Sequence, residues 1–191
     1  MSNLRQVIIG ASAAGLAAVE AIRKADKDCA ITVVSKEPMP LYSRVGLTHF
    51  IAREVGYDGM RMRDDGYFDR MKVRGVMGVA ALSVDPAARR VALSNGEKLA
   101  YDHLLVASGS HAVMPPIPGI NLEGIYTCIT NGDAAQIDES IAGATEVAVI
   151  GAGLIGIQVV DALIRRGCTQ GDQRAAWIHE DRVGHGRAVR P

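Results

Sequence analysis

The sequence lacks several features that mark whole classes of protein. Its 21 basic residues are matched by 21 acidic ones, so no excess charge favours nucleic acid or an anionic membrane. No unbroken apolar run reaches the roughly 18 residues of a transmembrane helix, and the first residues lack the basic-then-apolar order of a signal peptide. We therefore expect a cytoplasmic protein that has neither nucleic acid nor a membrane as its partner.

Cysteine is also scarce. The three cysteines, Cys29, Cys128 and Cys168, are far apart and include no C-x-x-C pair. An odd number at such spacing argues against a disulfide framework and against a zinc site. We expect reduced thiols and no metal ligands.

Glycine, by contrast, is plentiful, at 21 of 191 residues or about 11% against an average of about 7%. Gln6–Ile9 is a short apolar run typical of a buried parallel strand, and it stops at the glycine turn Gly10–Gly15. Leu16–Ala25 then has the apolar spacing of a helix, and the β-branched run Ile31–Val34 predicts a second strand.

The same pattern recurs near the end of the chain. Glu146–Ile150 predicts a strand, Gly151–Gly156 is a second glycine turn, and Ile157–Arg166 predicts a helix that ends at Gly167. The two turns begin 141 residues apart, which is too far for a solenoid repeat and suits two related nucleotide-binding domains.

The region between the turns changes character twice. Residues 39–71 predict loops and short helices, and residues 73–93 predict a small antiparallel meander. Residues 104–107 predict another buried strand. The sequence thus predicts an α/β, Rossmann-like fold with an inserted meander and an incomplete second dinucleotide domain. Three methionines are expected to fill gaps in the packing: Met60, Met62 and Met71.

The second turn matches G-x-G-x-x-G between a strand and a helix. In such a turn the first glycine allows a tight bend, the second lets a pyrophosphate approach the backbone, and the third brings helix against strand. The helix N-terminus then meets the phosphates. A turn that serves packing alone is the alternative. The candidate binding residues are Gly151, Gly153, Leu154, Ile155 and Gly156.

The first turn has serine at the middle position, where its hydroxyl can donate to a phosphate. Glu37 lies 22 residues beyond Gly15, near the offset of about 20 residues at which an acidic side chain holds a ribose 2′-hydroxyl. An exposed loop carboxylate is the alternative for Glu37. The candidates in this part of the chain are Gly10, Ser12, Ala13, Ala14, Gly15 and Glu37.

With Tyr101–Ser110, YDHLLVASGS, between them, the two turns resemble the pyridine nucleotide–disulfide oxidoreductase superfamily of FAD-dependent enzymes. The resemblance implies FAD at the first turn and NAD(P)H at the second. It also implies FAD contacts from a motif of the YDxLxxATGS kind, here carried by Ala107, Ser108 and Gly109, with Ser108 in place of threonine.

A further segment, Leu41–Thr48, is similar to the PYSRxxLS segment of rubredoxin-reductase-like and nitrite-reductase-like members. This likeness implies that Arg44 lies by the FAD, and the superfamily implies that the backbone near Ala81 lines the adenine. Thiol–disulfide chemistry is not expected, because no cysteine occurs between Cys29 and Cys128. His49 stands where many relatives place a lysine against the flavin, and a surface histidine is the alternative.

These motifs predict an FAD-binding domain over residues 1–120, the start of an NAD(P)-binding domain over 121–167, and an atypical tail over 168–191. Ala175–Glu180 is the one candidate for the next strand, with Glu180 lying 24 residues after Gly156. The abrupt loss of pattern at Cys168 predicts a truncated or out-of-frame copy of a longer reductase.

The function that the resemblance implies is that of an FAD-dependent NAD(P)H oxidoreductase. Hydride would pass to the flavin, and electrons would go on to an acceptor such as rubredoxin, ferredoxin or a nitrite-reducing centre. No side chain is assigned as catalytic, and the full-length relative is expected to form a homodimer. Two alternatives are an inactive nucleotide-binding remnant or module, and a dehydrogenase that uses nicotinamide alone.

Overall fold

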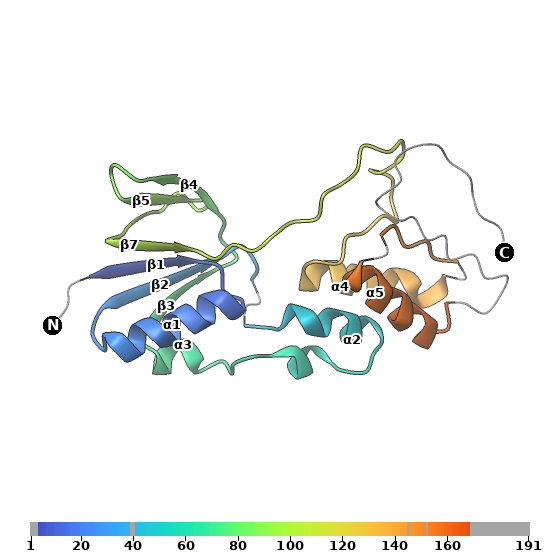
Figure 1. The fold of residues 1–191 in the computed structure, drawn as a ribbon, viewed down its shortest axis with the longest axis horizontal. Helices are drawn as coiled ribbons and strands as arrows, with labels where there is room; N and C mark the ends of the chain where they lie inside the picture. The colour runs from blue at the N-terminus through green and yellow to red at the C-terminus, as the bar shows by residue number, and fades with distance from the viewer. Residues whose placement is uncertain (1–3, 39–40, 145, 152, 169–191) are drawn as a thin grey trace. The chain divides into compact units, whose positions relative to one another are not determined.

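The computed structural model describes residues 4–38, 41–144, 146–151 and 153–168. The chain divides into two compact units (Figure 1). The first unit comprises residues 1–43 and 61–111, and the second comprises 44–60 and 112–191. The strand expected at 175–180, with Glu180, lies outside the described residues.

A parallel sheet forms the centre of the first unit. It comprises β1 (Arg5–Ile9), β2 (Ala30–Ser35), β3 (Val73–Met77) and β7 (His103–Val106), in the order β3-β2-β1-β7. All three neighbouring pairs are parallel. Because β1 is paired on both sides, the turn that follows it emerges between β2 and β7.

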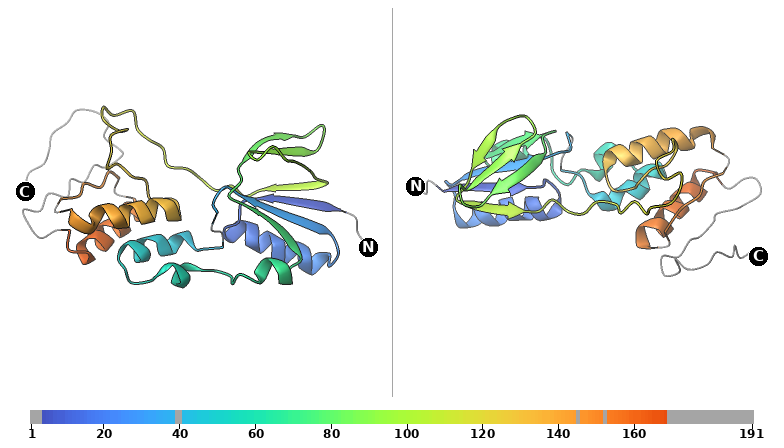
Figure 2. Two further views of the ribbon diagram at one scale, coloured as in Figure 1. Left: turned by 180° about the vertical axis from the view of Figure 1, so that it is seen from behind. Right: turned by 90° about the horizontal axis from the view of Figure 1, so that it is seen from above.

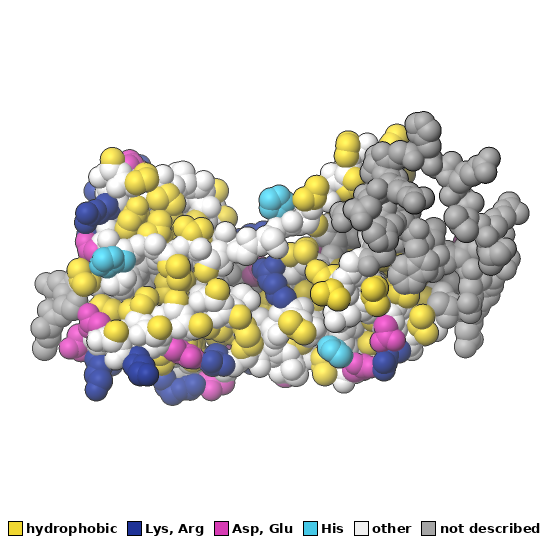
Figure 3. Space-filling model, viewed as in Figure 1, with side chains coloured by type: hydrophobic (Ala, Val, Ile, Leu, Met, Phe, Trp, Pro, Cys, Tyr) yellow, Lys and Arg dark blue, Asp and Glu magenta, His cyan; other side chains and the backbone are white. Residues whose placement is uncertain are grey.

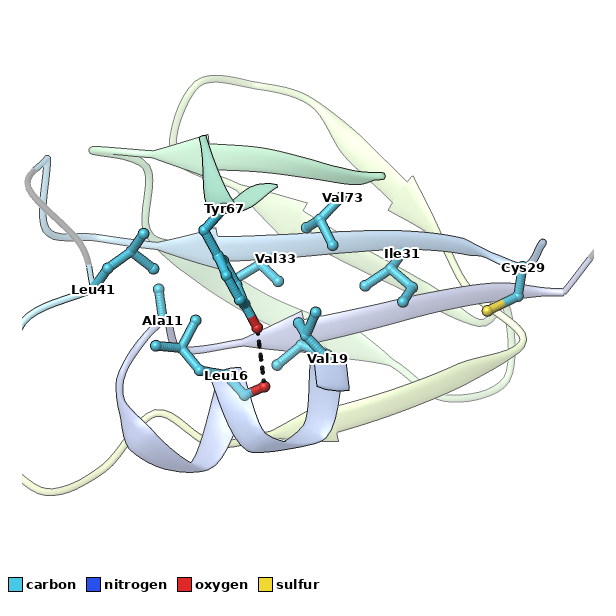
Figure 4. Packing of buried hydrophobic residues seen from close by; sticks show 10 residues of the cluster. Ala11, Leu16, Val19, Cys29, Ile31, Val33, Leu41, Tyr67 and Val73 are labelled. Carbon is cyan, nitrogen blue, oxygen red and sulfur yellow. Dashed lines mark hydrogen bonds between the residues drawn. The ribbon is translucent and has the colours of Figure 1, made fainter. Parts of the chain in front are cut away.

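One face of this sheet is covered by α1 (Ala13–Ala25), with α3 (Tyr67–Arg70) beside it (Figure 4). The hydroxyl of Tyr67 donates to the backbone oxygen of Leu16 over 3.4 Å. The methionines Met62 and Met71 pack against the same core, as expected of gap-filling side chains, and Met60 is buried in the second unit. The buried residues of this first core cluster are Ile8, Ala11, Leu16, Val19, Cys29, Ile31, Val33, Leu41, Tyr67 and Val73.

A second, antiparallel sheet covers the other face (Figures 1 and 2). It is built from β4 (Ala81–Asp85), β5 (Arg90–Leu93) and β6 (Lys98–Ala100), in the order β4-β5-β6. The inserted meander is therefore present, but its predicted start at residue 73 was wrong. Residues 73–77 form β3, which pairs in parallel with β2, because their apolar side chains are needed in the core of the parallel sheet.

The second unit contains η1 (Arg44–Gly46), α2 (Leu47–Ile51), η2 (Tyr57–Met60), α4 (Asn131–Ser140), η3 (Ile141–Gly143) and α5 (Leu154–Arg165). The short helix α2 packs against both α4 and α5. The guanidinium of Arg166 donates to the backbone oxygen of Ile51 over 2.7 Å and also to the carboxylate of Asp138. A single arginine thus joins the ends of three helices.

The helix α5 ends near Gly167 as expected, but it begins at Leu154 and not at the expected Ile157. Gly167 has a left-handed φ of +77°, and its N–H donates to Ile164 while that of Cys168 donates to Leu163, which closes the helix. The described residues of the second unit contain no strand over the expected range 146–150, where Ile150 takes part in a single β-bridge.

Within the described ranges, no helix is long and apolar enough to cross a membrane. Basic and acidic side chains are interleaved along the face of the first unit that Figure 3 presents, in keeping with the balanced composition.

Candidate dinucleotide-binding site

The first glycine turn lies at the carboxyl end of β1 and leaves no room for side chains at two of its positions. Gly10 has a φ of +117°, and a Cβ added there would lie 2.1 Å from the backbone oxygen of Ala107. A Cβ at Gly15 would lie 2.0 Å from the backbone oxygen of Gly10. Both glycines are therefore required by the close approach of strand, turn and helix.

The middle position of the turn is under no such restriction. Ser12 has a φ of −101° and a ψ of −166°, which is extended backbone that any residue can adopt. The equivalent Gly153 has a φ of −72°, and an added Cβ would meet nothing within 4 Å. The serine in place of glycine therefore leaves the backbone of the first turn unstrained.

The N-terminus of α1 is open. Ser12 is its N-cap but makes no side-chain capping bond, and no acidic residue lies in the first turn. Because the first N–H groups of a helix have no acceptor within it, those of Ala13, Ala14 and Gly15 carry the partial positive charge of the helix end. These N–H groups have no acceptor within the helix, so they can donate hydrogen bonds to an anion such as phosphate.

The contrast with α4 is clear, because its N-terminus is closed by the chain itself. Thr130 and Asp133 form a reciprocal capping box. The Asp133 carboxylate also accepts from the Thr127 hydroxyl at 2.8 Å and the Ile129 N–H at 2.9 Å. Although partial burial opposes its charge, these hydrogen bonds keep the pKa of Asp133 below its usual value. The negative charge at this helix end is therefore supplied by the chain itself.

Glu37 lies two residues beyond β2, at the same edge of the sheet as the first turn. The N–H of Gly10 donates to the backbone oxygen of Val34 over 2.8 Å, which joins the turn to the end of β2. The backbone oxygen of Glu37 accepts from Gly78 at 3.2 Å, and its carboxylate accepts a hydrogen bond from the hydroxyl of Tyr42. Sequence reasoning missed Tyr42, although it lies inside the Leu41–Thr48 segment.

The residues after β7 meet the first turn. Ala107 donates its N–H to Ile9 over 2.8 Å, and its backbone oxygen faces the Cβ position of Gly10. Ser108 follows at once, and Gly109 has a left-handed φ of +73°. The first glycine turn and the motif after β7 are about 100 residues apart in the sequence. They are adjacent in space because β1 and β7 are parallel neighbours, whose carboxyl ends lie at the same edge of the sheet.

The other predicted FAD contacts are distributed over both units. Ala81 begins β4 in the first unit, just after Val79, whose N–H donates to the backbone oxygen of Ser35 over 3.0 Å. Arg44 is half-buried in η1 of the second unit. Its place by the FAD stays a prediction. The side chain of His49 is 57% exposed and pairs with Glu54 at 2.6 Å, which fits a surface histidine.

The second glycine turn repeats the geometry of the first. Gly151 has a φ of +110°, and a Cβ at Gly156 would lie 2.0 Å from the backbone oxygen of Gly151. The N-terminus of α5 is also uncapped by a side chain and has no acidic residue in its first turn. Leu154 and Ile155 are both exposed there. In contrast to Gly10, a Cβ at Gly151 would meet nothing within 4 Å, and no strand of the described second unit runs beside it.

The cysteines take no part in this site. Cys29 and Cys168 are buried, and all three thiols are free. Burial, helped by the nearby Asp133 carboxylate, raises the pKa of Cys128 to about 11, so this thiol stays protonated near neutral pH. Among the described residues, no cluster of three or more histidine, cysteine or acidic side chains is arranged to hold a metal ion.

A parallel sheet with a glycine turn and an open helix end after its first strand, and an acidic residue after its second, defines a dinucleotide-binding fold. The sequence matches the family described as pyridine nucleotide-disulphide oxidoreductase over residues 4–184. The chain belongs to this family.

Named relatives agree with this assignment. The epsilon subunit of an NADH-dependent phenylglyoxylate dehydrogenase from Aromatoleum evansii is 34% identical over 170 residues, 88% of this chain and 40% of that protein. Rhodocoxin reductase from Rhodococcus erythropolis is 33% identical over 162 residues, which cover 84% of this chain and 38% of that protein. The crystal structure of NADH:rubredoxin oxidoreductase from Clostridium acetobutylicum superposes with a TM-score of 0.79 at 28% identity, covering 87% of this chain and 43% of that one.

The chain thus spans about two fifths of the length of the curated relatives it matches. The family and the Rossmann-like fold are confirmed as expected from the sequence, and the named relatives are oxidoreductases and a dehydrogenase subunit. The division at residues 120 and 167 and the roles of individual residues stay predictions.

Proposed function

We infer that this chain carries the FAD-binding part, and the beginning of the NAD(P)H-binding part, of an FAD-dependent NAD(P)H oxidoreductase. The observation that carries the proposal is the convergence of three features at one edge of the parallel sheet. These are the open N-terminus of α1, the Glu37 carboxylate after β2, and the turn after β7.

Each feature suits one part of FAD. The N–H groups of Ala13, Ala14 and Gly15 would bind the pyrophosphate, with the Ser12 hydroxyl as a further donor. Glu37 would accept a hydrogen bond from a hydroxyl of the adenosine ribose. The remaining assigned contacts come from the family resemblance and are Gly10, Arg44, Ala81, Ala107, Ser108 and Gly109.

The second turn would bind NAD(P)H in the same way. Gly151 and Gly156 supply the tight bend, and Gly153, Leu154 and Ile155 present the helix N-terminus to the pyrophosphate. When bound, the two cofactors supply hydride transfer from nicotinamide to flavin. The protein binds and orients them, and no side chain is needed as an acid, a base or a nucleophile.

The names of the relatives support further parts of the proposal. One is a rubredoxin oxidoreductase and another a rhodocoxin reductase, so we assign the full-length protein a small electron-transfer protein or a nitrite-reducing centre as its electron acceptor. We place it in the cytoplasm, where thiols such as these three stay reduced, and assign it a homodimeric state.

A specific observation favours an inactive nucleotide-binding remnant as the second candidate. Leu154 is 84% exposed, and Ile155 and Ile157 are 52% exposed, along a helix whose sheet is not formed by the described residues. A second domain without its sheet would leave NAD(P)H without half of its site.

Titration of FAD into the purified 191-residue protein tests the proposal. Binding should quench the flavin fluorescence, and anaerobic NADH should then bleach the flavin absorbance. Binding without bleaching would favour the remnant. Unchanged flavin fluorescence, together with tight binding of NADH, would favour a dehydrogenase that uses nicotinamide alone.

A further inference from the structure

The hydroxyl of Tyr42 donates a hydrogen bond to the carboxylate of Glu37. We propose that Tyr42 is a positioning residue, which holds the Glu37 carboxylate ready to accept a hydrogen bond from a hydroxyl of the adenosine ribose of FAD. This inference rests on the proposed function, since it concerns the same site, and it adds a residue that the sequence motifs did not assign.

Glu37 is held through both its backbone and its side chain. Its N–H donates to the Ser35 hydroxyl at 3.2 Å, and its backbone oxygen accepts from Gly78 at 3.2 Å. The Tyr42 hydroxyl then reaches one carboxylate oxygen, Oε2. An ionised carboxylate has about four acceptor positions on its two oxygens, so it can accept from the Tyr42 hydroxyl and from a ribose hydroxyl at the same time.

Tyr42 is itself a rigid support. The residue is only 4% exposed, and its backbone pairs with Arg61 in an isolated antiparallel bridge. The preceding Leu41 is buried in the first core cluster, and its backbone oxygen accepts from Met62 at 2.6 Å. The hydroxyl is therefore presented by a buried ring on a backbone that is anchored on both sides.

Leu41 also adopts a strained conformation. Its φ of +70° lies in the left-handed region, which is unfavourable for a leucine. Such strain persists only where the surroundings impose it, and it is frequent at ligand sites. Here the strained residue directly precedes the tyrosine and turns the chain so that Tyr42 reaches back five residues to Glu37.

The benefit of this arrangement is preorganisation. A glutamate free to change rotamer loses that freedom when it binds a ligand, which weakens binding. Because Tyr42 orders the carboxylate during folding, the loss no longer falls on the binding step. The effect should therefore be specific for a ligand that has a ribose hydroxyl to offer.

The test uses Tyr42→Phe in the 191-residue protein, with ADP and 2′-deoxy-ADP as competitors of FAD. The buried ring stays, and only the hydroxyl is lost. We expect FAD affinity to fall about tenfold, equivalent to about 1.4 kcal/mol, and the preference for ADP over 2′-deoxy-ADP to be lost. Glu37→Asp, which withdraws the carboxylate by one methylene and leaves the buried ring untouched, should cause the same loss of preference.

Tyr67→Phe is the matched control, because it removes another buried hydroxyl that contacts a carboxylate, that of Glu20 at 3.3 Å. It should keep the wild-type preference. The inference alone is overturned if Glu37→Gln abolishes the preference while Tyr42→Phe keeps it, or if Tyr42→Phe weakens both competitors equally, as a purely structural role would. Failure of the wild-type protein to bind FAD at all would overturn the proposed function and this inference together.

Discussion

Arg5 and Asp102 form a two-pronged ion pair between the first strand and the turn that leads into β7. The Nε and Nη2 atoms of Arg5 donate to the two carboxylate oxygens at 3.0 and 2.8 Å, and the backbone N–H of Arg5 donates to Oδ2 at 2.8 Å. The N–H of Asp102 returns a bond to the oxygen of Arg5 at 2.9 Å. These bonds set the register in which Ala107 meets Gly10 at the other end of the two strands.

This ion pair predicts an acid-sensitive contribution to stability. The hydrogen bonds from Arg5 lower the pKa of Asp102 far below its usual value. A carboxyl with a depressed native pKa stabilises the fold above its unfolded pKa of about 3.9, and this stabilisation is lost as the pH falls further. Asp102→Asn should therefore lower the melting temperature more at pH 7 than at pH 2.5, where part of this stabilisation has been lost. Asp28→Asn, on an exposed loop residue, should show no such difference.

Gly15 is predicted to tolerate no side chain. Because a Cβ there would lie 2.0 Å from the oxygen of Gly10, Gly15→Ala should reduce the free energy of unfolding by about 2–3 kcal/mol in urea denaturation. Gly56→Ala is the control, since an added Cβ meets nothing within 4 Å, and it should change stability by no more than about 0.5 kcal/mol. Equal stabilities for the two variants would contradict the steric argument.

Ser12→Asp should separate stability from cofactor binding. Aspartate is a good N-cap and complements the positive end of α1, so the melting temperature should rise slightly. The same charge would repel the pyrophosphate, and FAD affinity should fall about tenfold or more, measured by fluorescence titration. Ser12→Asn, a neutral N-cap, should keep most of the affinity. If the aspartate variant binds FAD as well as wild type, the phosphates do not lie at this helix end.

Arg23 is predicted to be a structural residue of the first unit. Its guanidinium donates to the backbone oxygens of Cys29 at 3.0 Å, Met71 at 2.9 Å and Lys72 at 3.1 Å. Arg23→Met keeps the apolar stem but leaves these acceptors without their charged donor, and it should cost about 2–3 kcal/mol in urea denaturation. Lys24→Met, on the exposed side of the same helical turn, should cost less than about 0.5 kcal/mol.

Cys128 should be unreactive in the folded protein. With its pKa raised to about 11 by burial, it should react with iodoacetamide at pH 8 about a hundredfold more slowly than an unperturbed cysteine of pKa about 8.5. Mass spectrometry of alkylated peptides measures this rate, and protein unfolded in urea supplies the reference. A rate equal to that of the unfolded chain would show that the thiol is not buried.

Local patterns in the sequence predicted the elements that carry the glycine turns. The first strand and its turn formed as expected, and α1 and α5 formed with their expected ends, although each helix begins three residues earlier than expected. These features depend on residues a few positions apart, such as a glycine that alone adopts a left-handed φ. The helix α4 was missed even though Thr130 and Asp133 form a capping box, because its low content of apolar residues hides its periodicity.

Other features depend on partners far away in the sequence. The apolar runs at 73–77 and 146–150 have similar strand-like patterns. The first pairs with β2 along its whole length, whereas among the described residues of the second only Ile150 takes part in a β-bridge. A strand forms only when its backbone N–H and C=O groups are hydrogen-bonded to a neighbouring strand. A local sequence pattern cannot predict whether that neighbour is present.

The sequence by itself determined the class of fold, the family and the positions of the two glycine turns that precede a helix. Only the tertiary structure decided that the backbone oxygen of Ala107 lies against Gly10, that Arg5 donates to the carboxylate of Asp102, and that Tyr42 donates to the carboxylate of Glu37. The physical reason is that glycine turns and helix ends follow from short-range steric rules, whereas contacts between distant side chains follow from the pairing of whole strands and the packing of their connections.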